Sequence, residues 1–188
     1  MSAQIKLIFT ALLLAGLVTA GCSQEPKSAK GHVMKIQLTS AAFANGRPIP
    51  AKYTGDALDI SPPLAWTNKP PGTKSFALIA DDPDAPVGTW VHWVIYDLPP
   101  TTTKLAEDQL KVAQFKDGTK QGLNDFKKTG FGGPAPPPGK AHRYYFKLYA
   151  LDKMTALAPN ATKADLLKAM DGHVLGEGQL KGTYQRQQ

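Results

Sequence analysis

The pattern of apolar and polar residues predicts a chain built mostly of β-strands. Lys35–Thr39 alternates polar and apolar side chains, as in a strand with one buried face. Ser75–Ala80 is a short apolar run, which is typical of a strand covered on both faces. Trp90–Leu98 and Tyr144–Leu151 are long and rich in aromatic and β-branched residues, and Val174–Tyr184 is a further candidate interrupted by glycines.

One helix is predicted near the C-terminus. Thr162 can cap its first turn together with Asp165, in a variant of the capping box. Leu166 and Met170 give the helix an apolar side, and Gly172 can end it. We therefore expect a single late helix in an otherwise β-rich chain.

The segments between the strands are turn-like. They are rich in proline, and Asp117–Gly118 is typical of a hairpin turn after Val112–Phe115. Strands separated by proline-rich turns and followed by a late helix predict a mainly β fold, a sandwich of two antiparallel sheets with a C-terminal helix.

Residues 1–21 are predicted to be a signal peptide. Lys6 supplies a positive charge, and Leu7–Val18 is apolar but shorter than the roughly 20 residues that cross a membrane. Thr19–Cys22 resembles a bacterial lipobox, in which the chain is cut before the cysteine and the cysteine is lipidated. Cleavage after Ala20, as in an ordinary secreted protein, is the alternative.

Cys22 is the only cysteine, so no intramolecular disulfide can form. We expect it to anchor a lipoprotein to a membrane of the cell envelope, facing the periplasm in a Gram-negative cell; a soluble secreted or periplasmic protein is the alternative. Residues 22–32 would then be a tether and residues 33–188 one domain. The formal net charge of +7 comes from scattered lysines, so nucleic-acid binding is not expected.

An acidic turn carries the first candidate chemistry. Asp82 and Asp84 are two residues apart, so an extended chain presents both carboxylates on one side. Pro83 and Pro86 restrict the backbone around them. His92 follows in the next predicted strand, which makes this region a candidate site.

Alternation in two aromatic strands places a histidine beside an aromatic residue in each. In the first strand, one face is expected to hold Trp90, His92, Val94 and Tyr96, opposite Val91, Trp93 and Ile95. In the second, one face is expected to hold His142, Tyr144, Phe146 and Leu148.

Between these strands, Gly132–Gly133 lets the backbone approach a ligand and can direct amide N–H groups at an anion. Each signal also has a structural interpretation, because single histidines often belong to the core and Asp-Pro pairs to ordinary turns. A divalent metal on the carboxylates and histidines is a further option, but no His-x-x-x-His spacing favours it, and no cofactor is expected.

Taken in order, these segments resemble the phosphatidylethanolamine-binding proteins, in particular their bacterial Raf kinase inhibitor-like branch. The resemblance runs from about Lys35 to Arg186. The matching motifs are Ile60–Trp66, Asp81–Pro86, Trp90–Val94, Gly132–Pro134 with His142–Tyr144, and Gly182–Tyr184.

The resemblance implies a β-sandwich with a small pocket for an anion or a phospholipid headgroup. Carried over by position, the pocket residues are Asp82, Asp84, Ala85, Pro86, Trp90, His92, Gly133, Pro134, His142 and Tyr144. A protonated histidine and backbone amides would hold phosphate, while the aspartates would orient the histidines or receive an ammonium group.

The resulting hypothesis is a non-enzymatic binding protein for phosphate or a phosphoethanolamine headgroup. Family members elsewhere also inhibit kinases or proteases, and no protein partner is identified by the sequence. One alternative is a hydrolase of phosphate esters that depends on a metal or on a His/Asp base. Another is a protease inhibitor that acts through its surface loops.

Overall fold

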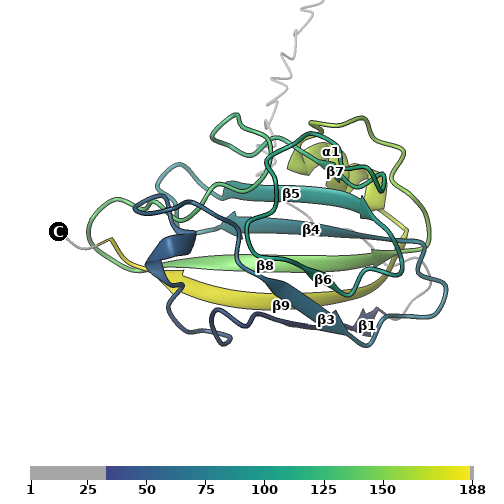
Figure 1. Ribbon diagram of the computed structural model, residues 1–188, viewed down its shortest axis with the longest axis horizontal. Helices are drawn as coiled ribbons and strands as arrows, with labels where there is room; N and C mark the ends of the chain where they lie inside the picture. Colours follow the sequence, from purple (N-terminus) through teal and green to yellow (C-terminus); the bar gives the residue numbers. More distant parts are fainter. Residues whose placement is uncertain (1–32, 187–188) are drawn as a thin grey trace, which may run out of the picture.

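The computed structural model describes residues 33–186 as a two-layered β structure with one α-helix (Figure 1). The predicted signal peptide, tether and Cys22 lie outside the described residues. No helix within residues 33–186 is long and apolar enough to cross a membrane. The elements are β1 (Met34–Lys35), β2 (Gln37–Thr39), the 3-10 helix η1 (Ala51–Tyr53), β3 (Leu64–Thr67), β4 (Ser75–Asp82), β5 (Trp90–Leu98), β6 (Lys104–Leu105), β7 (Lys120–Gln121), β8 (His142–Leu151), α1 (Lys163–Met170) and β9 (Val174–Tyr184).

The strands form a large and a small sheet. The large sheet has the order β1-β9-β8-β4-β5-β7, and the small one the order β2-β3-β6. Every pairing between these strands is antiparallel except the short parallel contact of β1 with β9. The predicted mainly β sandwich with a C-terminal helix is confirmed, with that one parallel pair added.

The first predicted strand, Lys35–Thr39, is divided between the two sheets. β1 pairs with β9 in the large sheet, and β2 pairs with β3 in the small one. Ile36 lies at the crossing, where its N–H donates to the Glu177 carbonyl at 2.7 Å. A Cβ on Gly178 would lie 2.6 Å from the Ile36 carbonyl oxygen, so this glycine allows the close approach.

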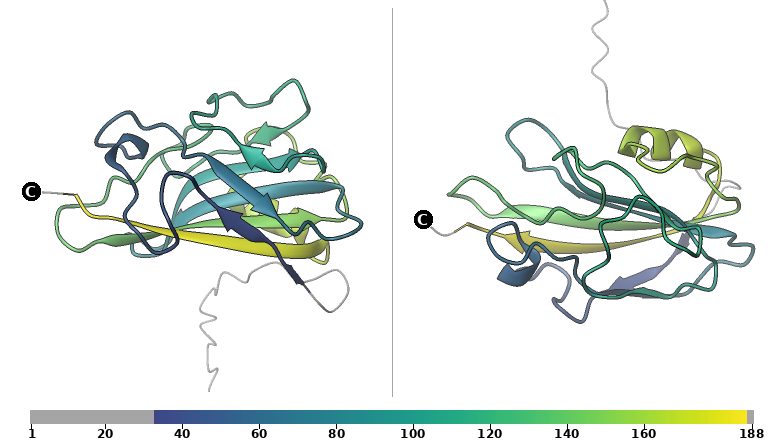
Figure 2. Two further views of the ribbon diagram at one scale, coloured as in Figure 1. Left: turned by 60° about the horizontal axis from the view of Figure 1, so that its bottom comes forward. Right: turned by 45° about the horizontal axis from the view of Figure 1, so that its top comes forward.

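The main core fills the space between the two sheets, and a smaller cluster lies between the large sheet and α1. Figure 2 shows α1 on one side of the large sheet and η1 on the other. Representative buried residues of the main core are Leu64, Trp66, Phe76, Leu78, Phe146 and Leu148. Representative residues of the helix-side cluster are Ala77, Ile79, Val94, Tyr96, Leu166 and Met170.

The capping box of α1 is confirmed. The Thr162 hydroxyl accepts from the Asp165 N–H, and the Asp165 carboxylate accepts from the Thr162 N–H at 2.9 Å. Gly172 has a φ of 75°, which suits its predicted place at the end of the helix. The hairpin turn at Asp117–Gly118 is also confirmed, because the Phe115 N–H donates to the Thr119 carbonyl across it.

Candidate functional site

Strand β5 carries a bulge at His92. Ala80 of β4 pairs with Trp93, and the next residue of β4, Asp81, pairs with Val91. His92 is therefore the extra residue of β5 at this point. A bulge of this kind changes the direction of side chains and often lies next to a functional site.

The bulge corrects the predicted alternation of β5. Val94 and Tyr96 were expected on the face of His92, but they lie in the helix-side cluster. Trp93 and Ile95, expected on the opposite face, lie in the core between the sheets. The prediction was wrong beyond His92 because one extra residue shifts the two-residue period by one position.

Strand β8 keeps its predicted alternation. Tyr144, Phe146 and Leu148 lie in the core between the sheets, whereas Tyr149 lies on the helix side. This regular strand pairs with β4 on one side and β9 on the other, so neighbours hold both of its edges. His142, at the start of β8, is thereby brought to the end of β4, where the acidic turn begins.

A cavity of about 210 Å³ lies where β4, β5 and β8 meet the acidic turn and the proline-rich loop. Seven of the ten predicted pocket residues line it. These seven are Asp82, Ala85, Pro86, Trp90, His92, His142 and Tyr144. Among the described residues, the lining also includes Val87, Phe126, Ala135, Pro136 and Pro137, which the sequence analysis did not select.

The three other predicted residues, Asp84, Gly133 and Pro134, lie outside this lining. Phe126 was missed because no pattern around it marks a site; its ring lies 5.5 Å from the His92 ring, centroid to centroid. Pro136 could have been found, since it lies only two residues after the Gly132–Pro134 segment that the sequence analysis singled out. Ligand binding by the predicted residues remains a prediction.

Asp82 and His142 form a buried pair at the cavity. The Asp82 carboxylate accepts from His142 Nδ1 at 2.7 Å, and from the Asp84 N–H at 2.8 Å. Both side chains are buried, with Asp82 4% and His142 10% exposed. Because Nδ1 is engaged, Nε2 is the ring nitrogen of His142 that is left for a ligand.

Asp84 is paired with Arg143 instead of a histidine. Its two carboxylate oxygens accept from Arg143 Nε at 2.8 Å and Nη2 at 2.7 Å, and one also accepts from the Arg143 N–H. These bonds to the guanidinium lower the pKa of Asp84 to about 2. The charge of Asp84 is therefore compensated beside the cavity, and the carboxylate holds the acidic turn against the start of β8.

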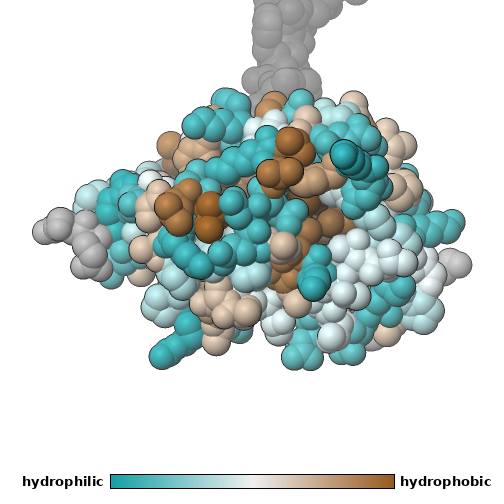
Figure 3. Space-filling view, viewed as in Figure 1, coloured by the Kyte–Doolittle hydropathy of each residue, from teal (hydrophilic) through white to brown (hydrophobic). Residues whose placement is uncertain are grey.

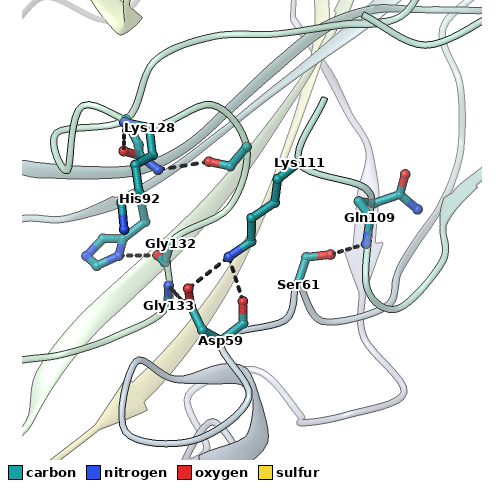
Figure 4. Close-up of polar contacts among 10 residues, drawn as sticks. Asp59, Ser61, His92, Gln109, Lys111, Lys128, Gly132 and Gly133 are labelled. Carbon is teal, nitrogen blue, oxygen red and sulfur yellow. Dashed lines mark hydrogen bonds and ion pairs between the residues drawn. The ribbon is translucent and has the colours of Figure 1, made fainter. Parts of the chain in front are cut away.

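The ring orientation of His92 is set by a backbone carbonyl. His92 Nδ1 lies 2.6 Å from the Gly132 carbonyl oxygen (Figure 4). A carbonyl only accepts, so Nδ1 carries the proton. Burial lowers the pKa of His92 below its ordinary value of 6.5, and the Gly132 carbonyl and the nearby charge of Asp82 oppose this only in part. The neutral ring therefore presents Nε2 as a hydrogen-bond acceptor.

The two glycine amides proposed for an anion are already engaged inside the chain. The Gly132 N–H donates to the His92 carbonyl at 2.9 Å, and the Gly133 N–H to Asp59 Oδ1 at 2.6 Å. Lys111 in turn holds Asp59 at 2.8 Å (Figure 4). A Cβ on Gly133 would lie 2.5 Å from the Tyr53 carbonyl oxygen, so this glycine is needed for packing. The interpretation of these amides as anion ligands is not supported.

Two buried polar atoms of cavity residues lack a hydrogen-bond partner among the described residues. They are the Tyr144 hydroxyl and Trp90 Nε1. Tyr144 is 3% exposed, and burial, reinforced by the negative charge of Asp82, raises the pKa of its phenol. Both groups are therefore protonated donors at neutral pH. Within residues 33–186, no group of three or more His, Cys, Asp or Glu side chains is placed to hold a metal ion.

Known proteins are similar to this chain in sequence and in fold. The family model described as phosphatidylethanolamine-binding protein matches residues 39–185. A UPF0098 protein of Methanothermobacter thermautotrophicus is 50% identical over 151 residues, which cover 80% of this chain and 99% of the relative. The crystal structure of a putative phosphatidylethanolamine-binding protein homologue from Chlamydia trachomatis is similar, with a TM-score of 0.74 and 43% identity over 81% of this chain and 98% of that one.

The crystal structure of YbcL from E. coli, described as a member of the mammalian family, gives a TM-score of 0.71 at 33% identity, covering 81% of this chain and 99% of that one. Sequence and fold thus agree over the domain that contains the cavity. The chain belongs to the phosphatidylethanolamine-binding protein family.

Proposed function

We propose that this protein is a non-enzymatic binding protein whose cavity takes a small phosphate-bearing ligand, such as inorganic phosphate or a phosphoethanolamine headgroup. The observation that carries the proposal is the buried Asp82–His142 pair at the cavity, which leaves His142 Nε2 for a ligand; two residues of the same lining, Tyr144 and Trp90, add buried donors, Tyr144 OH and Trp90 Nε1. Phosphate oxygens are strong acceptors that would complete these hydrogen bonds.

The energetics favour such a ligand. A buried polar group without a partner costs about 1–3 kcal/mol, so an oxyanion that accepts from both donors recovers much of that free energy on binding. The cavity of about 210 Å³ is smaller than a typical drug-sized site, which supports a ligand of a few heavy atoms.

The charges around the cavity favour a zwitterion or a singly charged anion. The Asp82 carboxylate repels a bare dianion, whereas it attracts an ammonium group. The name of the family refers to a lipid whose headgroup carries both a phosphate and an ammonium group, and membership in that family supports this ligand class.

Calorimetry tests the proposal. Phosphate and phosphoethanolamine should bind to the wild-type chain, and His142→Ala should weaken binding by roughly 10- to 100-fold, the worth of a hydrogen bond to a charged group. His173→Ala is the matched control, because His173 pairs with Asp152 at 2.8 Å and does not line the cavity. Equal affinity in His142→Ala and the wild type would contradict the proposed site.

The same samples distinguish the alternatives. Turnover of a phosphate ester that chelator treatment abolishes would favour a metal-dependent hydrolase over a binding protein. Inhibition of a kinase or protease that survives His142→Ala would favour action through surface loops. The apolar residues on the face of Figure 3 form small patches surrounded by hydrophilic ones, and two exposed apolar side chains, Val87 and Phe126, line the cavity.

A further inference from the structure

We propose that the cavity recognises a proton on the ligand: it selects a phosphoryl group that still carries a P–O–H and discriminates against oxyanions that have none. This inference rests on the proposed function, since it specifies which form of a phosphate-bearing ligand the same cavity takes. Its basis is the arrangement of donors and acceptors around the cavity, in which His92 would accept a hydrogen bond from the P–O–H.

His92 is fixed as an acceptor by its backbone contacts. The Gly132 carbonyl oxygen accepts from His92 Nδ1 at 2.6 Å, while the Gly132 N–H donates to the His92 carbonyl, so ring and loop restrain each other. The second ring nitrogen points away from Gly132 (Figure 4) and has no hydrogen-bond partner among the described residues. An acceptor at a cavity wall is satisfied by a ligand that donates.

The rings around His92 reduce its freedom to reorient. The Tyr144 and Phe126 rings meet it edge to face, with centroids 5.2 and 5.5 Å away. A side chain held on both sides cannot easily flip to offer a donor instead. His92 Nε2 therefore remains a hydrogen-bond acceptor at the cavity.

The charged groups near His92 also favour a ligand that carries a proton. Asp81 and Asp82 of β4 and Asp125 of the loop before β8 place negative charge near His92. Asp82 and His142 form the other polar wall, where the Nδ1 bond to the carboxylate leaves Nε2 for the ligand. Fully deprotonated phosphate would meet the His92 acceptor and the negative charge of these aspartates.

A monoprotonated phosphate monoester can form hydrogen bonds with His92, Tyr144 and Trp90 at the same time. Its P–O–H donates to His92 Nε2, and its unprotonated oxygens accept from the Tyr144 hydroxyl and Trp90 Nε1. A phosphodiester or a sulfate monoester has the same single charge but no proton on oxygen. It would leave His92 unpaired in a buried site, which is costly.

The test compares methyl phosphate with methyl sulfate by calorimetry at pH 6. There roughly half of a phosphate monoester is the monoanion, since its second pKa is about 6. The two probes then share charge and shape and differ in one proton. After correction for the monoanion fraction, methyl phosphate should bind at least about tenfold more tightly to the wild-type chain.

The pH dependence gives a second readout on the unmodified chain. Between pH 6 and 8 the affinity for methyl phosphate should fall about 50-fold as the monoanion disappears, roughly fivefold over the first unit and ninefold over the second, while the affinity for methyl sulfate stays level. Burial lowers the pKa of His92, which opposes its protonation at the acidic end of this range.

His92→Phe keeps an aromatic ring between Tyr144 and Phe126 but removes the acceptor. It should abolish the preference for methyl phosphate over methyl sulfate, whereas His173→Phe, at the partly exposed pair with Asp152, should retain the preference. If His92→Phe does not fold, the two wild-type measurements still decide.

The outcomes separate the two proposals. Equal affinity for methyl phosphate and methyl sulfate overturns the proton-recognition inference and leaves phosphate binding intact. The same holds if ethanolamine alone binds more tightly than methyl phosphate, because the donor would then be the ammonium group. Glycerophosphoethanolamine, a diester like the lipid headgroup, should bind less tightly than phosphoethanolamine, and the reverse order also overturns the inference. Failure of phosphate, methyl phosphate and phosphoethanolamine to bind at all overturns the proposed function itself.

Discussion

Replacing Lys163 by methionine tests the ion pair that joins α1 to the large sheet. Lys163 Nζ lies 2.5 Å from Asp81 Oδ2, and Lys147 Nζ lies 3.7 Å from the same oxygen. The Asp81 side chain is 2% exposed and that of Lys163 is 19% exposed. Methionine keeps the unbranched apolar stem but removes the nearer of the two cations from a buried carboxylate.

The expected loss follows from the burial. Breaking a fully buried pair by removing one partner costs about 3–5 kcal/mol. Here Lys147 remains within reach and Lys163 is partly exposed, so we expect a loss of about 1.5–3 kcal/mol in the free energy of unfolding. For a domain of this size that corresponds to a fall in Tm of roughly 3–12 °C.

Thermal unfolding followed by circular dichroism measures this loss. Lys168→Met is the matched control, because Lys168 is an exposed lysine on the same helix and should change Tm by less than about 2 °C. Adding Asp81→Asn to Lys163→Met should recover part of the loss, since no unpaired charge is then buried. Equal Tm values for Lys163→Met and Lys168→Met would refute the reasoning.

Three further predictions address the acidic turn, the glycine loop and the N-terminus. The pKa of Asp84 is lowered from 3.8 to about 2 in the folded chain, so its pairing with Arg143 stabilises the fold above pH 4 and ceases to do so as the pH falls through 2. The Tm difference between wild type and Arg143→Ala should therefore be constant above pH 4 and shrink below it; a difference that grows on acidification would contradict the pairing. Gly133→Ala should lower the free energy of unfolding by about 1–3 kcal/mol, because its Cβ would overlap the Tyr53 carbonyl oxygen, and urea titration measures this. Cys22→Ala should move the protein from the membrane to the soluble fraction of its host, and an unchanged distribution would count against the predicted lipid anchor.

The local parts of the fold could be predicted from the sequence because the signals are local. The α1 capping box needs only Thr162 and Asp165, three residues apart, and both bonds form as expected. The alternation of β8 also held, because that strand is regular and paired on both edges, so Tyr144 and Phe146 share the expected face. Both features can be read from residues that lie close together in the sequence.

The rest depends on partners far away in sequence. The bulge at His92 is defined by the pairing of β4 with β5, and no residue type within β5 predicts it. The pairing of Asp84 with Arg143 joins residues 59 positions apart, so the prediction could place the carboxylate but not its partner. Gly133 was singled out correctly as a position of close approach, but what approaches it is Tyr53 and Asp59 of its own chain.

The two histidines of the cavity illustrate how the fold orients the polar side chains of the proposed site. Each has one ring nitrogen tied to an acceptor, Asp82 for His142 and the Gly132 carbonyl for His92. The acceptors are themselves held, because the Asp84 N–H donates to Asp82 and the Gly132 N–H donates to the His92 carbonyl. The acidic turn therefore acts by orienting His142 and by fixing β8, not by presenting two free carboxylates. It follows that Asp82→Asn should change ligand affinity through His142, whereas Asp84→Asn should mainly loosen the turn.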